Sequence, residues 1–228
     1  MISHPHRTLF VHIPKVAGQS IETMFLNAMD LSWEQRATLL LRERKPGEKG
    51  PERLAHLTAQ EYVDLGYLDE KSFKAYFKFT FVRNPYARVF STYNFLGFSR
   101  LVSFSYFIEK IVPLKLKQHD FFFKPAHEYL LDNNGNLLVD FVGKLEHIKE
   151  DIEIVKAKTN LEGASLPHVN KEKGGWKRAI GLLVRNPNML WHLQLKNASA
   201  MEAAYTETTK KKIYQWYQKD FEIFEYQR

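Results

Sequence analysis

A lysine, a glycine and a serine lie close together in one short segment whose composition suits the binding of an anion. The segment reads HIPKVAGQS from His12 to Ser20, after an apolar run and before a helix-like stretch. Backbone N–H groups in a first helical turn lack partners within the helix, so they can donate to a phosphate whose charge the helix dipole favours. Gly18 would permit close approach of the backbone, Ser20 would add a hydroxyl donor, and Lys15 would supply a mobile ammonium group. The alternative interpretation is an ordinary turn with a surface lysine.

A second segment, FVRNPYARVFSTY from Phe81 to Tyr93, also carries groups that can hold an anion. Arg83 is expected at the carboxyl end of a strand, where α/β sheets bind ligands, and its planar guanidinium suits a phosphate dianion. Ser91 follows about two helical turns later, within reach of the same anion if the helix runs back beside the arginine. Two such strand ends in one sheet imply a ligand with two phosphate groups. Taken singly, Arg83 and Ser91 also fit a surface pair, and Arg88 is expected to be structural or solvated.

Each of these segments needs a strand before it and a helix after it, and the sequence predicts both. The apolar runs RTLFVHI (7–13) and YFKFTFV (76–82) are typical of buried strands. Helical patterns follow them, in IETMFLNAM and from near Tyr86. The strand–loop–helix unit therefore occurs twice.

The remaining elements continue this alternation of strands and helices. A third strand is predicted at 137–142 after a turn at 133–136, and 42–53 is predicted to be an exposed loop. Helices are expected at 58–65, partly within 101–131, at 146–158 and at 205–219. The prediction is an α/β fold: one domain over 1–228, a central, mostly parallel sheet flanked by helices, and a P-loop-like phosphate-binding strand–loop–helix.

Composition excludes some classes of protein but does not identify one. A chain of 228 residues that is 44% hydrophobic is long enough to bury a core. The formal charge of +7 favours an anionic partner without choosing among nucleotide, sulfated glycan, nucleic acid and acidic membrane. The lack of cysteine excludes disulfides and thiolate chemistry. Residues 1–7 form no apolar signal core, and no run approaches the roughly 20 apolar residues that span a bilayer, so we expect a cytoplasmic protein without a transmembrane segment.

The two anion-binding segments resemble those of a known family. HIPKVAGQSIE and FVRNPYARVFSTY are similar to the segments that bind 3′-phosphoadenosine 5′-phosphosulfate (PAPS) in the sulfotransferase family that includes heparan sulfate 2-O- and chondroitin 4-O-sulfotransferases and shorter bacterial relatives. The resemblance spans most of the chain, continuing through PAHEY (125–129), DFVGKLE (140–146), LPHVNK (166–171) and YQKDFEIF (217–224).

The resemblance implies a role for each matching residue. The first segment would hold the 5′-phosphosulfate through Lys15, Val16, Ala17, Gly18, Gln19 and Ser20. Arg83 and Ser91 would hold the 3′-phosphate, and Lys171 would close over the donor or hold an anionic acceptor, unless it lies in a merely solvated loop. The implied reaction is an in-line transfer of a sulfuryl group from PAPS to an acceptor hydroxyl, expected to belong to a saccharide, with Lys15 at the leaving oxygen. This chemistry requires no metal, and no cluster in the sequence has the spacing of a structural zinc site.

The attacking hydroxyl needs a base, and histidine is the natural choice. Of the nine histidines, His56 in HLTAQEY resembles the family's base-bearing histidine, which precedes a short helix. His168 in LPHVNK is the competing base or a ligand of the acceptor. Glu61 is a weaker candidate because the Thr58–Glu61 spacing predicts a capping box. His12 is expected to pack beside the loop.

The chain also departs from the family pattern. The family usually has threonine where this chain has Val16 and Gln19, so two hydroxyls that could donate to phosphate are missing. The basic stretch 176–204 is expected to be a helical insertion relative to short relatives, where substrate recognition can differ.

Two other classes of function remain as alternatives. A nucleotide-dependent kinase would also use two phosphate sites, but the lysine here precedes the only glycine of its loop, unlike the Gly-x-x-x-x-Gly-Lys-Ser/Thr motif, and no magnesium-holding acidic motif is evident. A nucleic-acid-binding module would use the positive charge, but the basic residues are scattered through the chain and no known nucleic-acid motif is present. We therefore expect no nucleic-acid partner.

Overall fold

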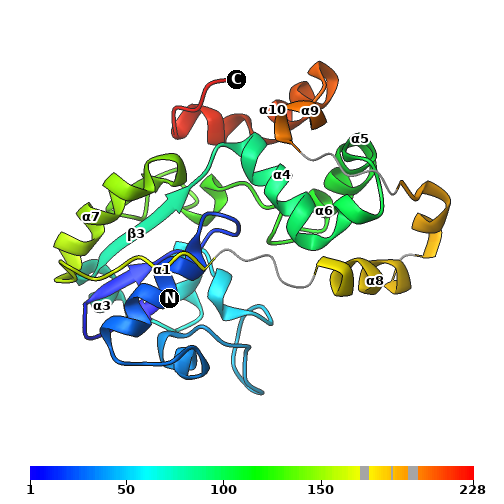
Figure 1. Ribbon diagram of the computed structural model, residues 1–228. Helices are drawn as coiled ribbons and strands as arrows, with labels where there is room; N and C mark the ends of the chain where they lie inside the picture. The colour runs from blue at the N-terminus through cyan, green and yellow to red at the C-terminus, as the bar shows by residue number, and fades with distance from the viewer. Residues whose placement is uncertain (170–174, 186, 195–199) are drawn as a thin grey trace. The chain divides into compact units, whose positions relative to one another are not determined.

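The computed structural model describes residues 1–169, 175–185, 187–194 and 200–228 (Figure 1). By its contacts the chain divides into two compact units, Met1–Arg83 with Ala126–Asn170, and Asn84–Pro125 with Lys171–Arg228. The first unit contains the sheet, and the second consists of helices around an aromatic core. That the whole chain forms one domain stays a prediction.

The sheet of the first unit has four strands in the order β1-β2-β3-β4. β2 (Thr8–Phe10), β3 (Phe77–Val82) and β4 (Phe141–Lys144) are parallel, and the short β1 (Ile2–Ser3) is antiparallel to β2. The predicted α/β fold with a mostly parallel sheet is therefore confirmed, with one antiparallel edge strand added. β1 has only two residues, too few to show a strand pattern in the sequence.

The third strand begins later than predicted. Leu137 pairs with Leu131 in an isolated antiparallel bridge, not in the sheet. This bridge closes the turn that Asp132 stabilises, where its carboxylate accepts hydrogen bonds from the backbone N–H groups of Asn134 and Asn136. The sheet strand is Phe141–Lys144, so the strand expected at 137–142 starts four residues too early.

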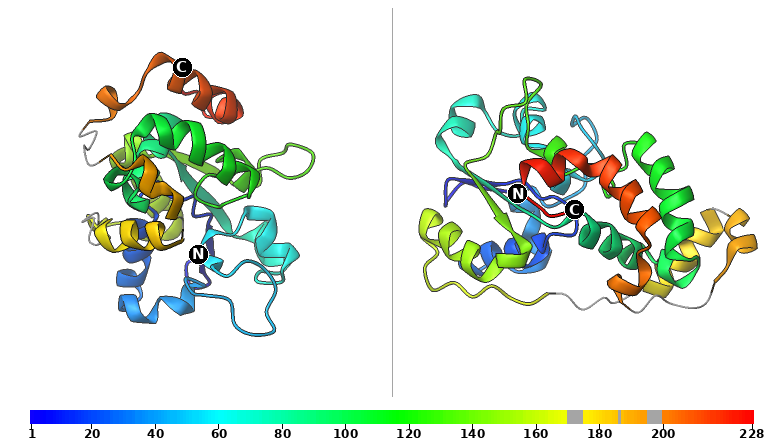
Figure 2. Two further views of the ribbon diagram at one scale, coloured as in Figure 1. Left: turned by 90° about the vertical axis from the view of Figure 1, so that its right-hand side faces the viewer. Right: turned by 90° about the horizontal axis from the view of Figure 1, so that it is seen from above.

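Helices lie on both faces of the sheet (Figure 2, right), and neighbouring side chains of β3 contact one on each face. On one face the ring of Phe79 lies 6.1 Å from that of Phe25 in α1 (Gly18–Ala28). On the other, the ammonium group of Lys78 lies 5.4 Å from the ring of Phe73 in α3 (Glu70–Ala75). α7 (Ile148–Thr159) contacts β3 and β4 and runs alongside β3 in Figure 1.

Local capping sets the starts of two helices. Before α2 (Ala59–Asp64), Thr58 and Glu61 form the predicted capping box. Before α4 (Pro85–Leu96), Asn84 Oδ1 accepts from the N–H groups of Tyr86 and Ala87, and proline occupies the first helical position. Both helix starts are thus fixed by residues within a few positions of them. Short 3₁₀ turns lie at Trp33–Leu39, Leu54–His56, Phe98–Arg100, His127–Tyr129, Leu145–His147 and Pro187–His192.

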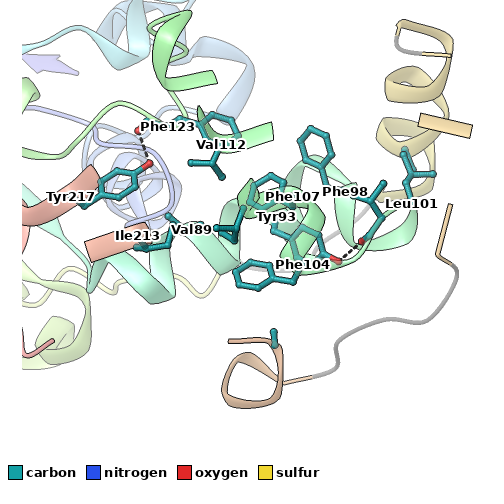
Figure 3. Close-up of a cluster of buried hydrophobic side chains, with 14 of the residues drawn as sticks. Val89, Tyr93, Phe98, Leu101, Phe104, Phe107, Val112, Phe123, Ile213 and Tyr217 are labelled. Carbon is teal, nitrogen blue, oxygen red and sulfur yellow. Dashed lines mark hydrogen bonds between the residues drawn. The ribbon is translucent and has the colours of Figure 1, made fainter. Parts of the chain in front are cut away.

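The second unit packs its helices around aromatic side chains (Figure 3). Two buried tyrosine hydroxyls donate hydrogen bonds to backbone carbonyls in this core. Tyr93 donates to Val102 at 2.6 Å, and Tyr217 donates to Phe123 at 2.7 Å. Besides α4, its elements are α5 (Phe104–Tyr106), a π-helical turn (Phe107–Ile111), α6 (Val112–Lys117), α8 (Gly175–Arg185), α9 (Met201–Ala204) and α10 (Glu207–Ile223).

Arg88, expected to be either structural or solvated, has a structural role. It is buried in the second unit, where Nη2 donates to the carbonyl of Lys124 at 2.7 Å and Nη1 lies 4.0 Å from the carboxylate of Asp220. The arginine therefore joins α4, the segment after α6, and α10.

Candidate active site

The loop between β2 and α1 has a backbone shape that suits an anion. Lys15 (φ 71°) and Ala17 (φ 64°) both adopt the left-handed conformation, which is uncommon for residues other than glycine. Alternation of left- and right-handed residues turns successive N–H groups toward one side and forms an anion-binding concavity. Within the described part of the chain, no side chain caps α1, and its first turn has no acidic residue. An anion would supply the missing acceptor.

Gly18, the first residue of α1, is required by the packing of His12. A Cβ atom on Gly18 would lie 2.0 Å from Nε2 of His12, well inside van der Waals contact. The imidazole therefore occupies the space that any other side chain would need. This packing explains the glycine structurally, and its contact with a ligand stays a prediction.

His12 joins the end of β2 to the second turn of α1. Its Nδ1 lies 2.5 Å from Oε1 of Glu22, and both side chains are largely buried. The imidazole also stacks on the ring of Phe10, with 5.5 Å between centroids. His12 thus packs beside the loop as expected, and Glu22 is the partner that holds it there.

His56 is positioned by the backbone of His12. Its Nδ1 lies 3.0 Å from the carbonyl oxygen of His12, and the two imidazole centroids are 4.5 Å apart. A carbonyl can only accept, so Nδ1 of His56 carries the hydrogen and Nε2 carries the lone pair that can take a proton. The sheet and the loop therefore fix the tautomer that a general base needs.

The surroundings keep His56 neutral at physiological pH. Its pKa is lowered to about 3, mainly by burial and also by the nearby imidazole of His12, while the hydrogen bond to the carbonyl of His12 acts in the opposite direction. The neutral imidazole is the form that accepts protons. A bound anion close to Nε2 would raise this pKa, because a negative charge stabilises the protonated ring.

The other candidate bases differ from His56 in their environment. Glu61 accepts from the backbone N–H of Thr58 at 2.7 Å, which confirms its expected role in the helix cap. His168 has an exposed side chain, although the neighbouring Val169 donates from its N–H to Oγ of Ser20 at 3.4 Å. His168 thus lies on a segment that passes the start of α1, while its imidazole lies in solvent.

Arg83 approaches the loop from the end of β3. Its Nη1 lies 3.5 Å from the carbonyl oxygen of Lys15, at the outer limit of a hydrogen bond. This places a guanidinium at the loop expected to hold the 5′ end of the donor. Its assignment to the 3′-phosphate stays a prediction.

Several predicted donor-binding residues would act only through the backbone or lie elsewhere. The side chain of Val16 is fully buried, and that of Gln19 is exposed. Ser91 lies on α4 in the second unit, so its shared role with Arg83 stays a prediction. Lys171 lies outside the described residues.

Glu22 is the site residue that sequence reasoning missed. It lies ten residues after His12, across the loop, so no local spacing links the two side chains. The available signal was an acidic residue within the apolar helix face IETMF, because a carboxylate is rarely buried without a partner.

The described residues contain neither a metal-binding cluster nor a membrane-spanning helix. Among them, no group of three or more His, Asp or Glu side chains could hold a metal ion. In the same part of the chain, no helix is both long and apolar enough to cross a membrane.

Comparison with known proteins places the chain in a family. A family model described as the sulfotransferase family matches residues 1–227. The chain therefore belongs to the sulfotransferase family, that of the heparan sulfate 2-O- and chondroitin 4-O-sulfotransferases. No curated protein and no solved structure gave a significant match. Membership supports a transferase that moves a sulfuryl group to a hydroxyl acceptor.

Proposed function

We propose that this chain transfers a sulfuryl group from PAPS to a hydroxyl group of a saccharide. The observation that carries the proposal is the hydrogen bond from Nδ1 of His56 to the carbonyl of His12. It holds a neutral imidazole in the proton-accepting tautomer directly beside a loop shaped for an anion. A base next to an anion site is the arrangement that sulfuryl transfer requires.

The residues of the loop fit the 5′ end of the donor. Backbone N–H groups at the start of α1 would donate to the phosphosulfate, and the helix dipole would favour its charge. Ser20 accepts from Val169 through Oγ and retains a hydroxyl hydrogen to donate. The side chains of Val16 and Gln19 add no hydroxyl, so backbone donors, Lys15 and Ser20 carry this role. Arg83 and Ser91 would hold the 3′-phosphate.

The proposed transfer forms one bond to sulfur and breaks another. The acceptor oxygen forms a bond to sulfur while the bond from sulfur to the bridging oxygen breaks, and that electron pair stays on the 5′-phosphate. The ammonium group of Lys15 would stabilise the developing charge, and Nε2 of His56 would take the proton of the acceptor hydroxyl. The anionic donor would bring the pKa of His56 up toward working pH.

Ligand binding tests this proposal against the two alternatives. Thermal unfolding is followed with adenosine 3′,5′-bisphosphate, with ATP and Mg²⁺, and with a short oligonucleotide, because a ligand that binds only the folded state raises the melting temperature. Adenosine 3′,5′-bisphosphate should give the largest rise at equal concentration. A larger rise with ATP would favour a kinase, and one with the oligonucleotide would favour a nucleic-acid-binding module; either would contradict the proposal.

A further inference from the structure

α8 presents a row of large apolar side chains to solvent. Trp176, Ile180 and Val184 follow each other at intervals of four residues, which places them along one side of the helix. Their side chains are 61%, 59% and 77% exposed. A helix in a folded protein normally buries such a row.

An adjacent side of α8 packs against the core of the second unit. Ala179 is fully buried, and Leu182 and Leu183 pack against the aromatic core. Arg178 donates to the carbonyl of Phe95 at 2.9 Å, with its guanidinium 3.9 Å from the centre of the Phe95 ring. The helix therefore has a core-facing side of its own, and the exposed row is additional.

Further large apolar side chains are exposed in the segment that follows the helix. Leu190, Trp191 and Leu193 are 55%, 87% and 39% exposed. The chain is anchored here by the backbone N–H of Gln194, which donates to the carbonyl of Leu101 at 2.7 Å. Of the large apolar side chains that are exposed in the described part of the chain, most lie in this one stretch. We call this set the α8 surface: Trp176, Ile180, Val184, Leu190, Trp191 and Leu193.

The charge of the same stretch is entirely positive. From Lys173 to Met201, both included, the sequence has five lysine or arginine residues and no aspartate or glutamate. Two of the cations, Lys177 and Arg185, are exposed on α8 itself. Exposed tryptophan and aliphatic side chains next to cations, without carboxylates, are typical of helices that lie in a membrane interface.

We propose that the α8 surface binds the surface of an anionic lipid bilayer, with its apolar side chains at the acyl boundary and its cations at the headgroups. A second copy of the chain fits less well, because pairing this surface with itself would bring cations onto cations. A nucleic acid would use the cations but leave the isoleucine and valine exposed to water. This inference is independent of the proposed enzymatic function.

Vesicle sedimentation with the full chain tests the proposal. Binding is compared between vesicles of phosphatidylcholine alone and vesicles that also contain phosphatidylserine. The chain should sediment with the anionic vesicles at least about tenfold more strongly, and added salt should weaken this binding because headgroup attraction is screened. Equal binding to both vesicles, or binding to neither, would overturn the proposal.

Variants locate the binding surface. Trp176→Ser with Ile180→Ser should weaken binding to anionic vesicles by about tenfold or more, because apolar area drives insertion. The matched control is Leu137→Ser with Ile154→Ser, which removes two apolar side chains of the first unit that are 48% and 46% exposed. The control should bind as the wild type does.

Two outcomes would overturn the assignment. One is equal loss of binding in both pairs of variants, which would place the contact elsewhere. The other is a wild-type dimer in sedimentation velocity that Trp176→Ser with Ile180→Ser dissociates, which would identify a second copy as the occupant. An unchanged melting temperature in the variant with Trp176→Ser and Ile180→Ser would confirm that the fold is retained, since both residues are more than half exposed.

Discussion

His56, the proposed proton acceptor, differs from its rival His168 in its contacts and its exposure. His56 has its Nδ1 committed to the carbonyl of His12, whereas the side chain of His168 is exposed. Under saturating PAPS, His56→Ala should lower turnover by roughly a hundredfold to ten-thousandfold, with little change in donor affinity, because the residue addresses the acceptor. His56→Asn should not restore the rate, since an amide cannot take a proton.

The matching variant of His168 supplies the comparison. His168→Ala should keep turnover within a few fold of the wild type. The rate should fall at low pH, where the base becomes protonated. If His168→Ala loses turnover and this fall at low pH while His56→Ala retains both, the base is His168.

The lowered pKa of His56 also has a consequence for stability. The folded state holds this pKa at about 3, whereas its ordinary value is 6.5. Between these values the unfolded chain binds a proton that the folded chain does not, so the free energy of unfolding should fall as pH decreases from 6.5 toward 3. His56→Gln should remove part of this loss, measured by urea unfolding at pH 7 and pH 5. An identical loss in both proteins would contradict the burial of a neutral His56.

Arg83 tests the assignment of the donor phosphates. Arg83→Ala should weaken binding of adenosine 3′,5′-bisphosphate more than binding of adenosine 5′-phosphate, which lacks the 3′ group. Isothermal titration of both ligands measures the difference. Equal losses would instead fit the position of the guanidinium near the carbonyl of Lys15 and assign Arg83 to the 5′ end.

At the scale of secondary-structure elements, Gly18 controls how α1 meets β2. Gly18→Ala should destabilise the protein by roughly 1–3 kcal/mol, because the added methyl group overlaps the imidazole of His12. The control is Gly181→Ala within α8, where nothing lies within 4 Å of the added atom. That change should stabilise by about 0.5–1 kcal/mol through helix propensity. Urea unfolding measures both.

A double variant isolates the cause. In a His12→Ala background the cost of Gly18→Ala should shrink, because the overlapping ring is gone. An unchanged cost would mean that the glycine is needed for its backbone conformation or for a ligand, and not for the packing of His12.

The elements that were predicted correctly are those whose signals are local. The apolar run at β3 and the Thr58–Glu61 spacing identify their own elements. β1 was missed and β4 was placed too early because short strands are defined by their partners, and the bridge between Leu131 and Leu137 is a tertiary contact. Patterns along the sequence do not contain that information.

The candidate site was predictable to the same degree. Sequence motifs predicted both His56 and the loop, and the structure places them side by side. The pairing of Glu22 with His12 and the packing of His12 against Gly18 depend on the return of the chain from strand to helix. Such contacts follow from the fold, so residue types alone could not give them.

At the scale of the whole molecule, the formal charge of +7 would serve both proposed anionic partners. The first unit carries the loop with Lys15 and Arg83, and the second carries the basic stretch around α8. Positive potential over a protein raises the local concentration of anionic ligands, and added salt screens it. Donor binding and vesicle binding should therefore both weaken with salt but respond to different substitutions.

The most direct test of the account is a transfer assay with radiolabelled PAPS and a panel of saccharide acceptors. The wild type should move the label from PAPS to at least one acceptor and release adenosine 3′,5′-bisphosphate in equal amount. Lys15→Ala should lower this turnover by about a hundredfold or more, while binding of adenosine 3′,5′-bisphosphate falls less, because the ammonium group acts on charge that develops during transfer. Near-normal turnover in Lys15→Ala would contradict the role of the loop, and failure of the wild type to transfer label to any acceptor while it binds ATP more tightly than adenosine 3′,5′-bisphosphate would contradict sulfuryl transfer from PAPS.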